Sequence, residues 1–233
     1  MTNWEKIKLG DILQLSNEKS ITQNQFPVLT SSRTGLYLQS DYFKKIVASK
    51  NNIGYKIIKK GQFTYRAMSD DGYFKFNRLV NQKAGIISPA YEVFDVKEGA
   101  VNAIFIYYLL NSIIISSQIY NAAQGGTRLA LRFSTLAKFR VRLPPLNEQK
   151  KIAEILSGID KLIFNIKEEI IKLKFLEKSL INNFFQCEVK NNKYKENKLV
   201  KISVNWQIVS LHEISKGIGD GLHSTPTYSD KTE

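Results

Sequence analysis

The sequence is poor in the residues on which disulfides, zinc sites and histidine chemistry depend. A single cysteine, Cys187, among 233 residues excludes a disulfide framework and a cysteine-built zinc site. That cysteine has no base-like neighbour, which favours an incidental or buried thiol over a nucleophile. The two histidines, His212 and His223, have no acidic cluster beside them that would indicate a metal site. We therefore expect no metal, no cofactor and no catalytic activity in the chain itself.

Long apolar runs are also missing. The first residues contain no apolar signal segment, and the longest apolar stretch, Ala103–Leu110, is broken at Asn111 and Ser112. A membrane-spanning helix needs roughly 18 consecutive apolar residues. We therefore expect a soluble cytoplasmic protein that makes no contact with a membrane.

Acidic residues are scarce relative to basic ones, with 21 Asp and Glu against 34 Lys and Arg and a net charge of +13. Residues 1–143 hold 20 basic and 9 acidic residues, whereas residues 144–186 and 187–233 each hold 7 and 6. Nearly all of the excess therefore belongs to the N-terminal region. Such a concentration indicates a polyanionic partner, with nucleic acid first, although a basic surface without a partner remains an alternative.

The region 1–143 is predicted to be a mixed α/β (α+β) domain. Short β-rich runs at Gln62–Arg66, Gly72–Phe76 and Ile86–Phe94 are bounded by turn-forming residues. Residues Val101–Ser116 are predicted to be helical, and Lys138–Leu143 to form a final strand. The buried face of that helix is expected to comprise Ile104, Tyr107, Tyr108 and Leu110. Asp70 and Asp71 precede Gly72, and we interpret them as turn residues and not as a metal or acid–base pair.

A long helix is predicted to follow Pro144-Pro145, which end the domain because proline cannot donate to a strand ladder. An apolar residue recurs every seventh position, at Ile152, Ile159, Ile166, Leu173 and Leu180. This repeat is typical of a coiled-coil seam, and we expect these five residues to pair with another helix. About 40 residues would form a rod of about 60 Å, which spans on the order of 17 base pairs. The alternative is an amphipathic helix packed on its own domain.

The end of the chain resembles its beginning. Asn3–Ile12 aligns without gaps on Asn205–Ile214, with identical Asn, Trp, Leu and Ile residues. An offset of 202 residues is the spacing of a duplicated domain plus its helix. We therefore predict a domain at 1–145, a coiled-coil spacer at 146–188, a lysine-rich linker at 189–202 and an incomplete second α/β domain at 203–233.

These residues resemble a known family. The segment Leu143–Asp160 is similar to the "PPLxEQxxIAxxLxxxD" start of the helical region in specificity subunits of type I restriction–modification systems. Trp4 with Leu9–Ile12 resembles the start of their target recognition domains, and Gly221–Tyr228 resembles a "GxHxTPxY" segment of such domains. Gln124–Phe133 resembles the segment before their final strand. By this resemblance the chain is a specificity subunit that stops early in its second recognition domain.

The resemblance implies double-stranded DNA, adenine methyltransferase subunits and restriction subunits as partners, in a bacterial or archaeal cell defending itself against foreign DNA. Each recognition domain would read one half of a split DNA site. A homodimer of such short chains, with their helices antiparallel, is a further expectation. Arg can pair with guanine, Gln with adenine, and Ser or Thr with base or phosphate. Three loops supply the predicted DNA-binding residues: Ser32, Arg33, Thr34, Tyr65, Arg66, Ser69, Gln124, Gly126, Thr127, Arg128 and Arg132. Four lysines, expected to be phosphate contacts or solvated charges, are Lys44, Lys45, Lys59 and Lys60.

Other functions remain open at this point. One is a specificity polypeptide of a type II-like system, which the sequence cannot separate from type I. Another is a basic coiled-coil scaffold or a nucleic-acid-binding protein outside restriction–modification. An enzyme is the third, and the missing active-site residues count against it.

Overall fold

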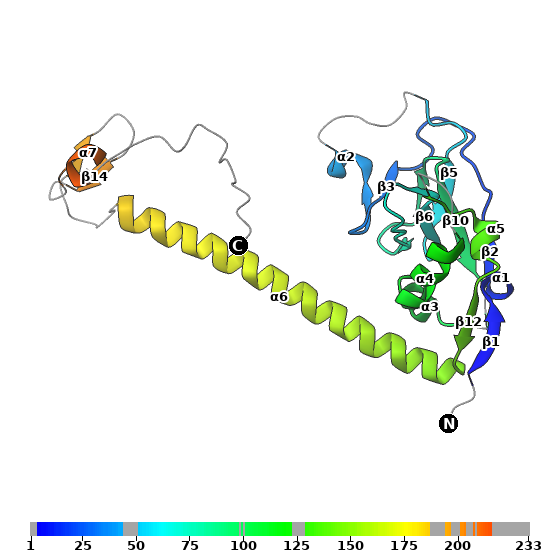
Figure 1. Cartoon of the computed structure of the whole chain (residues 1–233). Coiled ribbons are helices and arrows are strands. Elements are labelled where there is room, and N and C mark those ends of the chain that lie inside the picture. Colours follow the sequence, from blue (N-terminus) through cyan, green and yellow to red (C-terminus); the bar gives the residue numbers. More distant parts are fainter. Residues whose placement is uncertain are drawn as a thin grey trace, which may run out of the picture. The chain divides into compact units, whose positions relative to one another are not determined.

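The computed structural model shows a mixed α/β unit followed by a long helix (Figure 1). Two compact units divide the chain, Met1–Leu162 and Ile163–Glu233, and the boundary falls within the long helix. The residues that the structure describes are 4–43, 51–97, 99, 101–122, 129–186, 194–196, 201–203, 207 and 209–215. Among these residues, no single helix is long and apolar enough to cross a membrane.

The strands of the first unit are short, and every pair between them is antiparallel. They are β1 (Glu5–Lys8), β2 (Leu13–Leu15), β3 (Leu29–Ser31), β4 (Leu36–Leu38), β5 (Lys56–Lys59), β6 (Phe63–Arg66), β7 (Met68–Ser69), β8 (Asn77–Arg78), β9 (Ala84–Ile87), β10 (Tyr91–Val96), β11 (Leu129–Ala130) and β12 (Arg140–Leu143). A four-stranded sheet in the order β2-β10-β6-β8 forms the centre of the unit. Two-stranded pairs surround it: β1 with β12, β3 with β4, β5 with β9, and β7 with β11.

The core of the unit is aromatic and lies against the central sheet. Phe63 on β6 faces Phe94 on β10 in register, and their rings stack with centroids 5.4 Å apart. Tyr65 and Phe76 continue the cluster with ring centroids 4.8 Å apart. Each such side chain removes a large apolar area from water, so these residues contribute strongly to the stability of the unit. The predicted strand at Gln62–Arg66 is therefore confirmed, as β6.

Helices cover and extend this core. They are α1 (Leu9–Ile12), α2 (Gln39–Tyr42), α3 (Ala103–Leu110), α4 (Ile113–Ala122), α5 (Phe133–Leu136), α6 (Leu146–Gln186) and, in the second unit, α7 (Leu211–Ile214). The single helix predicted at Val101–Ser116 is wrong, because the chain breaks between α3 and α4. At the break, the Asn111 side-chain amide donates to the carbonyls of Tyr107 and Phe76. These bonds bind the end of α3 to the loop before β8.

Three further predictions about this unit need correction. Leu110 is buried as predicted, but Ile104 is exposed and Tyr107 and Tyr108 are only half-buried, and α3 also buries Phe105, Ile106 and Leu109. Gly72–Phe76 forms no strand, since its residues make a turn and a loop. The run Ile86–Phe94 is two strands, β9 and β10, which a short turn separates. The strand predicted before the prolines is confirmed, as β12.

The second unit repeats a local structure of the first. The backbone N–H of Lys8 donates to Asp11 Oδ2 at 3.0 Å at the start of α1. At an offset of 202 residues, the backbone N–H of Ser210 donates to Glu213 Oε2 at 3.3 Å at the start of α7. The sequence duplication therefore extends to helix capping. Within the predicted linker, residues Tyr194–Glu196 form β13, which pairs with β14 (Lys201–Ser203), so a hairpin occurs where no strand was predicted.

Candidate nucleic-acid interface

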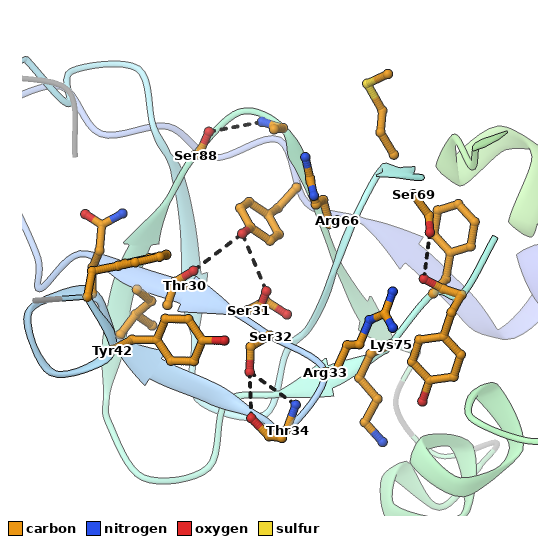
Figure 2. Close-up of a pocket in the computed structure, with 18 of the residues that line it drawn as sticks. Thr30, Ser31, Ser32, Arg33, Thr34, Tyr42, Arg66, Ser69, Lys75 and Ser88 are labelled. Carbon is orange, nitrogen blue, oxygen red and sulfur yellow. Dashed lines mark hydrogen bonds between the residues drawn. The ribbon is translucent and has the colours of Figure 1, made fainter. Parts of the chain in front are cut away.

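A polar hollow with a volume of about 710 Å³ opens on the surface of the first unit, between the tip of the β3–β4 hairpin and the loop after β6. We call it the basic groove (Figure 2). It brings together five residues that were predicted from two separate loops, and adds Lys75. These lining residues are Ser32, Arg33, Thr34, Arg66, Ser69 and Lys75.

The hairpin tip is a tight turn held by its own hydroxyl groups. The backbone N–H of Ser32 donates to the Gly35 carbonyl at 2.8 Å, and the Ser32 and Thr34 hydroxyls lie 2.9 Å apart. Asn77 on β8, a buried residue, fastens this turn to the sheet through its side-chain amide. That amide donates to Ser31 Oγ and to the Ser32 carbonyl, both at 2.7 Å. Asn77 could not be predicted as a support of this turn, because its partners lie more than 40 residues away in the sequence.

The facing turn is organised by Asp71, as its position before Gly72 predicted. Its Oδ1 accepts hydrogen bonds from the Ser69 hydroxyl at 2.9 Å and from the Tyr73 backbone N–H at 3.2 Å. Gly72 has a φ of +78°, in the left-handed region that favours glycine. A Cβ there would also lie 2.8 Å from Leu129 Cδ1. The backbone shape therefore favours glycine at this turn, whereas the close approach of the Leu129 side chain could be relieved by a small movement of that side chain.

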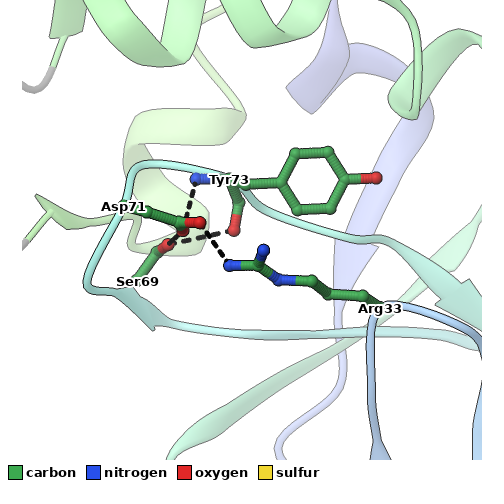
Figure 3. Close-up of polar contacts among 4 residues, drawn as sticks. All are labelled: Arg33, Ser69, Asp71 and Tyr73. Atoms are coloured by element: carbon green, nitrogen blue, oxygen red, sulfur yellow. Dashed lines mark hydrogen bonds and ion pairs between the residues drawn. The ribbon is translucent and has the colours of Figure 1, made fainter. Parts of the chain in front are cut away.

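The two turns meet through an ion pair (Figure 3). Arg33 Nη2 donates to Asp71 Oδ2 at 2.5 Å, and the Arg33 guanidinium carbon lies 5.2 Å from the centre of the Tyr73 ring. The hydrogen bonds from Arg33, Ser69 and the Tyr73 backbone lower the pKa of Asp71 from 3.8 to about 2. Asp71 is therefore charged at neutral pH, and it holds Arg33 from one side.

Two other cations line the groove. Arg66 is exposed at the end of β6, and within the described part of the chain its side chain makes no hydrogen bond or ion pair. Lys75 Nζ lies 5.2 Å from the centre of the Tyr107 ring. Lys59, by contrast, is paired with Glu18 at 2.6 Å, away from the residues that line the groove.

Some predicted DNA-binding residues do not fit this site. Tyr65 is wrong as a DNA contact, because it is fully buried in the aromatic core and burial raises the pKa of its hydroxyl. Ser69 lines the groove, but its nearly buried hydroxyl already bonds Asp71. Arg132 is exposed just before α5 and does not line the groove.

The third predicted loop lies largely outside the described residues. This applies to Gln124, Gly126, Thr127 and Arg128, as it does to Lys44 and Lys45. The strand that follows the loop, β11, pairs with β7, with Leu129 opposite Ser69. Strand β11 therefore lies beside Ser69, which lines the basic groove.

The start of α6 is fixed to the first unit by a cluster of polar contacts, which we call the helix joint. The buried Gln149 side chain accepts from the Asn102 backbone N–H and donates to the Pro144 carbonyl, both at 2.8 Å. Trp4 Nε1 donates to Glu148 Oε1 at 3.3 Å. The Tyr108 hydroxyl donates to Asp160 Oδ2 at 2.7 Å. The Glu, Gln and Asp of the helical motif are thus the residues that join helix and domain.

Beyond the joint, α6 carries its apolar residues on the surface. Ile152 packs partly against the core of its own unit, so it is not free for pairing with another helix. The remaining seam residues are all exposed, with exposed fractions of 47% for Ile159, 54% for Ile166, 63% for Leu173 and 46% for Leu180. Exposed apolar patches larger than a few hundred Å² commonly mark association surfaces.

Comparison with known proteins gives a consistent result. A family model described as "Type I restriction modification DNA specificity domain" matches residues 1–174. The type I restriction enzyme MjaVIII specificity subunit of Methanocaldococcus jannaschii is 24% identical over 217 residues, which cover 91% of this chain and 49% of that protein. The putative MjaX specificity subunit of the same organism is 32% identical over 93 residues, or 40% of this chain and 22% of that protein.

A solved structure shares the fold. The S subunit of a type I restriction–modification system from M. genitalium aligns with a TM-score of 0.54 at 18% identity. The alignment covers 81% of this chain and 47% of that one. The predicted fold class, an α/β domain followed by a long helix, is therefore confirmed. The chain spans about half the length of the MjaVIII subunit and of the M. genitalium subunit.

Proposed function

The chain belongs to the family of type I restriction modification DNA specificity domains, and we propose that it reads one half of a bipartite DNA site within such a complex. The observation that carries the proposal is the basic groove, which gathers Arg33, Arg66 and Lys75 within a region of net charge +11 (20 basic minus 9 acidic residues in 1–143). Positive charge at such a groove attracts phosphates regardless of sequence, while arginine at a turn can reach base edges.

We further propose that the chain itself is not catalytic and positions other subunits. Among the described residues, no group of three or more His, Cys, Asp or Glu side chains could hold a metal ion. The partners that the family suggests are adenine methyltransferase subunits and restriction subunits, which would supply the chemistry. The domain boundaries at 145, 188 and 202 belong to the same proposal. The first compact unit of the structure extends to Leu162, because the helix joint packs the start of α6 against the domain that precedes it.

The exposed row on α6 supports a second proposal, that two copies of the chain pair through antiparallel helices. The exposed apolar residues of the seam recur from Ile159 to Leu180, and a single helix cannot cover its own apolar face. Such a dimer has two-fold symmetry and places the same reader at both ends. It would therefore bind two inverted copies of one half-site, separated by a fixed spacer.

The test of DNA binding is salt dependence in the assembled complex. The chain, purified with its adenine methyltransferase subunit, is titrated against duplex DNA between about 50 and 200 mM salt. If several Lys and Arg residues contact phosphates, affinity should fall by roughly 10³-fold or more over this range. A complex that binds duplex DNA with no salt dependence, or that does not bind it, would contradict the proposal. Methyl-donor binding by the purified chain alone would contradict its non-catalytic role.

A further inference from the structure

We infer that Arg33 reads a guanine base, that Asp71 is the positioning residue that aims it, and that Arg66 contacts phosphate. The inference rests on the proposed function, since it states which arginine of the basic groove contacts a DNA base and which contacts a DNA phosphate. It assigns different roles to two arginines, Arg33 and Arg66, for which the sequence predicted only that both bind DNA.

The first argument comes from the contacts of Arg33. Its guanidinium carries five N–H donors, and only Nη2 is used by Asp71 in the described structure. The ring of Tyr73 lies beneath it, 5.2 Å from the guanidinium carbon to the ring centre. A guanidinium fixed at one nitrogen and on one face has its other donors free in a defined direction. Guanine offers the matching pair of acceptors, O6 and N7, in the major groove.

The second argument is energetic. Arg33 and Asp71 are about half exposed or more, with side-chain exposed fractions of 64% and 52%. Ion pairs at such sites contribute little to stability, because water and salt screen them. Yet Asp71 is itself held by Ser69 and by the Tyr73 backbone, and Asn77 fastens the turn that carries Arg33. These contacts fix the direction of the Arg33 side chain but contribute little to the stability of the fold.

The third argument is electrostatic. The charges of Arg33 and Asp71 cancel at short range, so this pair offers little attraction to a phosphate, and the Asp71 carboxylate repels one. The edge of a base has no net charge, so the Asp71 carboxylate does not repel it as it repels a phosphate. Arg66 has no carboxylate partner in the described structure and keeps its full charge, which suits a phosphate contact.

The experiment uses the full chain in complex with its methyltransferase subunit and a duplex library with a central random segment. Sequences retained by the wild-type complex define its target, and affinities are then measured on the selected and on a scrambled duplex at several salt concentrations. Arg33→Ala should lower affinity for the selected duplex on the order of 10-fold or more, with loss of preference at one guanine and an unchanged salt slope. Arg33→Lys keeps the charge but lacks the planar fork, so it should lose the same preference.

The matched variant is Arg66→Ala. It should weaken binding to the selected and scrambled duplexes equally and lower the salt slope by about 1, as removal of a phosphate contact does. Asp71→Asn keeps an oxygen for Ser69 and Tyr73 but removes the charge. It should relax the preference at the position that Arg33 reads, while raising affinity for the scrambled duplex.

The outcomes separate this inference from the proposed function. If the wild-type complex binds no DNA, the proposed function fails and the inference with it. If the wild type selects a target and Arg33→Ala selects the same one, only the inference is wrong. An Arg33→Ala variant that loses affinity uniformly and lowers the salt slope would make Arg33 a phosphate contact. An Asp71→Asn variant with the wild-type preference would remove Asp71 as a positioning residue.

Discussion

Gln149, near the start of α6, accepts a hydrogen bond from the backbone N–H of Asn102 at 2.8 Å, and so connects the long helix to the first turn of α3. Asn102 is also the cap of α3, since its Oδ1 accepts from the backbone N–H groups of Ile104 and Phe105. One buried amide therefore aligns two helices.

Replacing Gln149 with Leu should destabilise the first unit. The change leaves the Asn102 N–H and the Pro144 carbonyl buried without partners, and each such loss costs about 1–3 kcal/mol. Urea unfolding followed by circular dichroism measures the effect. The matched control is Gln14→Leu, at an exposed strand position, which should change the free energy of unfolding by no more than about 0.5 kcal/mol. Equal effects of the two changes would contradict the role given to Gln149.

Tyr65→Phe should leave DNA binding unchanged, because the side chain is fully buried. The Tyr65 hydroxyl has no hydrogen-bond partner among the described residues. Its removal should therefore leave the free energy of unfolding unchanged or raise it by about 1 kcal/mol. Tyr91→Phe is the comparison, since that hydroxyl lies 3.5 Å from Thr30 Oγ1. A loss above about 1 kcal/mol in Tyr65→Phe would show that its hydroxyl is bonded after all.

The ion pair in the basic groove should withstand acid. Because the pKa of Asp71 is lowered to about 2, its contribution to stability is complete above its ordinary pKa of 3.8 and disappears as the pH falls through about 2. The carbon-13 shift of the Asp71 carboxyl should therefore titrate near pH 2, and Arg33→Gln should move the midpoint up toward 3.8. A midpoint near 3.8 in the wild type would show that the pair does not form in solution.

Gly85→Ala should destabilise the unit, whereas Gly158→Ala should not. A Cβ at Gly85 on β9 would lie 2.3 Å from Leu29 Cδ1 and 2.6 Å from Leu29 Cγ, and Leu29 is buried. Overpacking of this kind costs about 1–3 kcal/mol. Gly158 lies within α6 with nothing within 4 Å of its added Cβ, so alanine there should raise stability by about 0.5–1 kcal/mol through helix propensity. The same unfolding measurement decides both, and a stable Gly85→Ala variant would contradict the packing described around Leu29.

Replacing Ile159 and Ile166 with Asp should yield monomers if α6 pairs with a second copy, because two charges would enter an apolar seam. Light scattering or sedimentation at tens of micromolar, an order-of-magnitude choice for a moderate coiled coil, gives the mass. Lys161→Asp with Lys167→Asp introduces the same number of aspartates at positions outside the seam, and this variant should remain dimeric. A wild-type chain that is monomeric under these conditions would exclude pairing between copies.

The sequence predicted elements well where a regular pattern decides the structure, and poorly where single long-range contacts do. The seven-residue repeat from Ile152 to Leu180 predicted α6, because helix periodicity is a local property. The break at Asn111 was missed because its side chain bonds Phe76, 35 residues away. The turn residues located both loops of the candidate site, but their meeting depends on a contact between Arg33 and Asp71 across 38 residues.

The prediction that Tyr65 contacts DNA was wrong for a different reason. The segment was correctly predicted as a strand, but Tyr65 was grouped with the polar residues of the loop that follows, whereas β6 buries Phe63, Thr64 and Tyr65 and exposes only Arg66. The roles of Asn77 in holding the hairpin turn and of Gln149 in the helix joint were not predicted, for the same reason as the Asn111 contact. Each acts through partners that only the folded chain brings near.

The antiparallel pairing of β1 with β12 means that the first unit is entered and left at one place, with Glu5 opposite Leu143. The chain between these two strands, which includes the residues of the basic groove, therefore starts and ends at neighbouring positions. Domains with adjacent termini tolerate exchange as whole modules. Under the proposed function, one DNA-reading domain could thus be exchanged for another, provided that the new domain keeps residues such as Asn102 and Tyr108 that contact α6. Such an exchange would give the proposed complex a new DNA half-site.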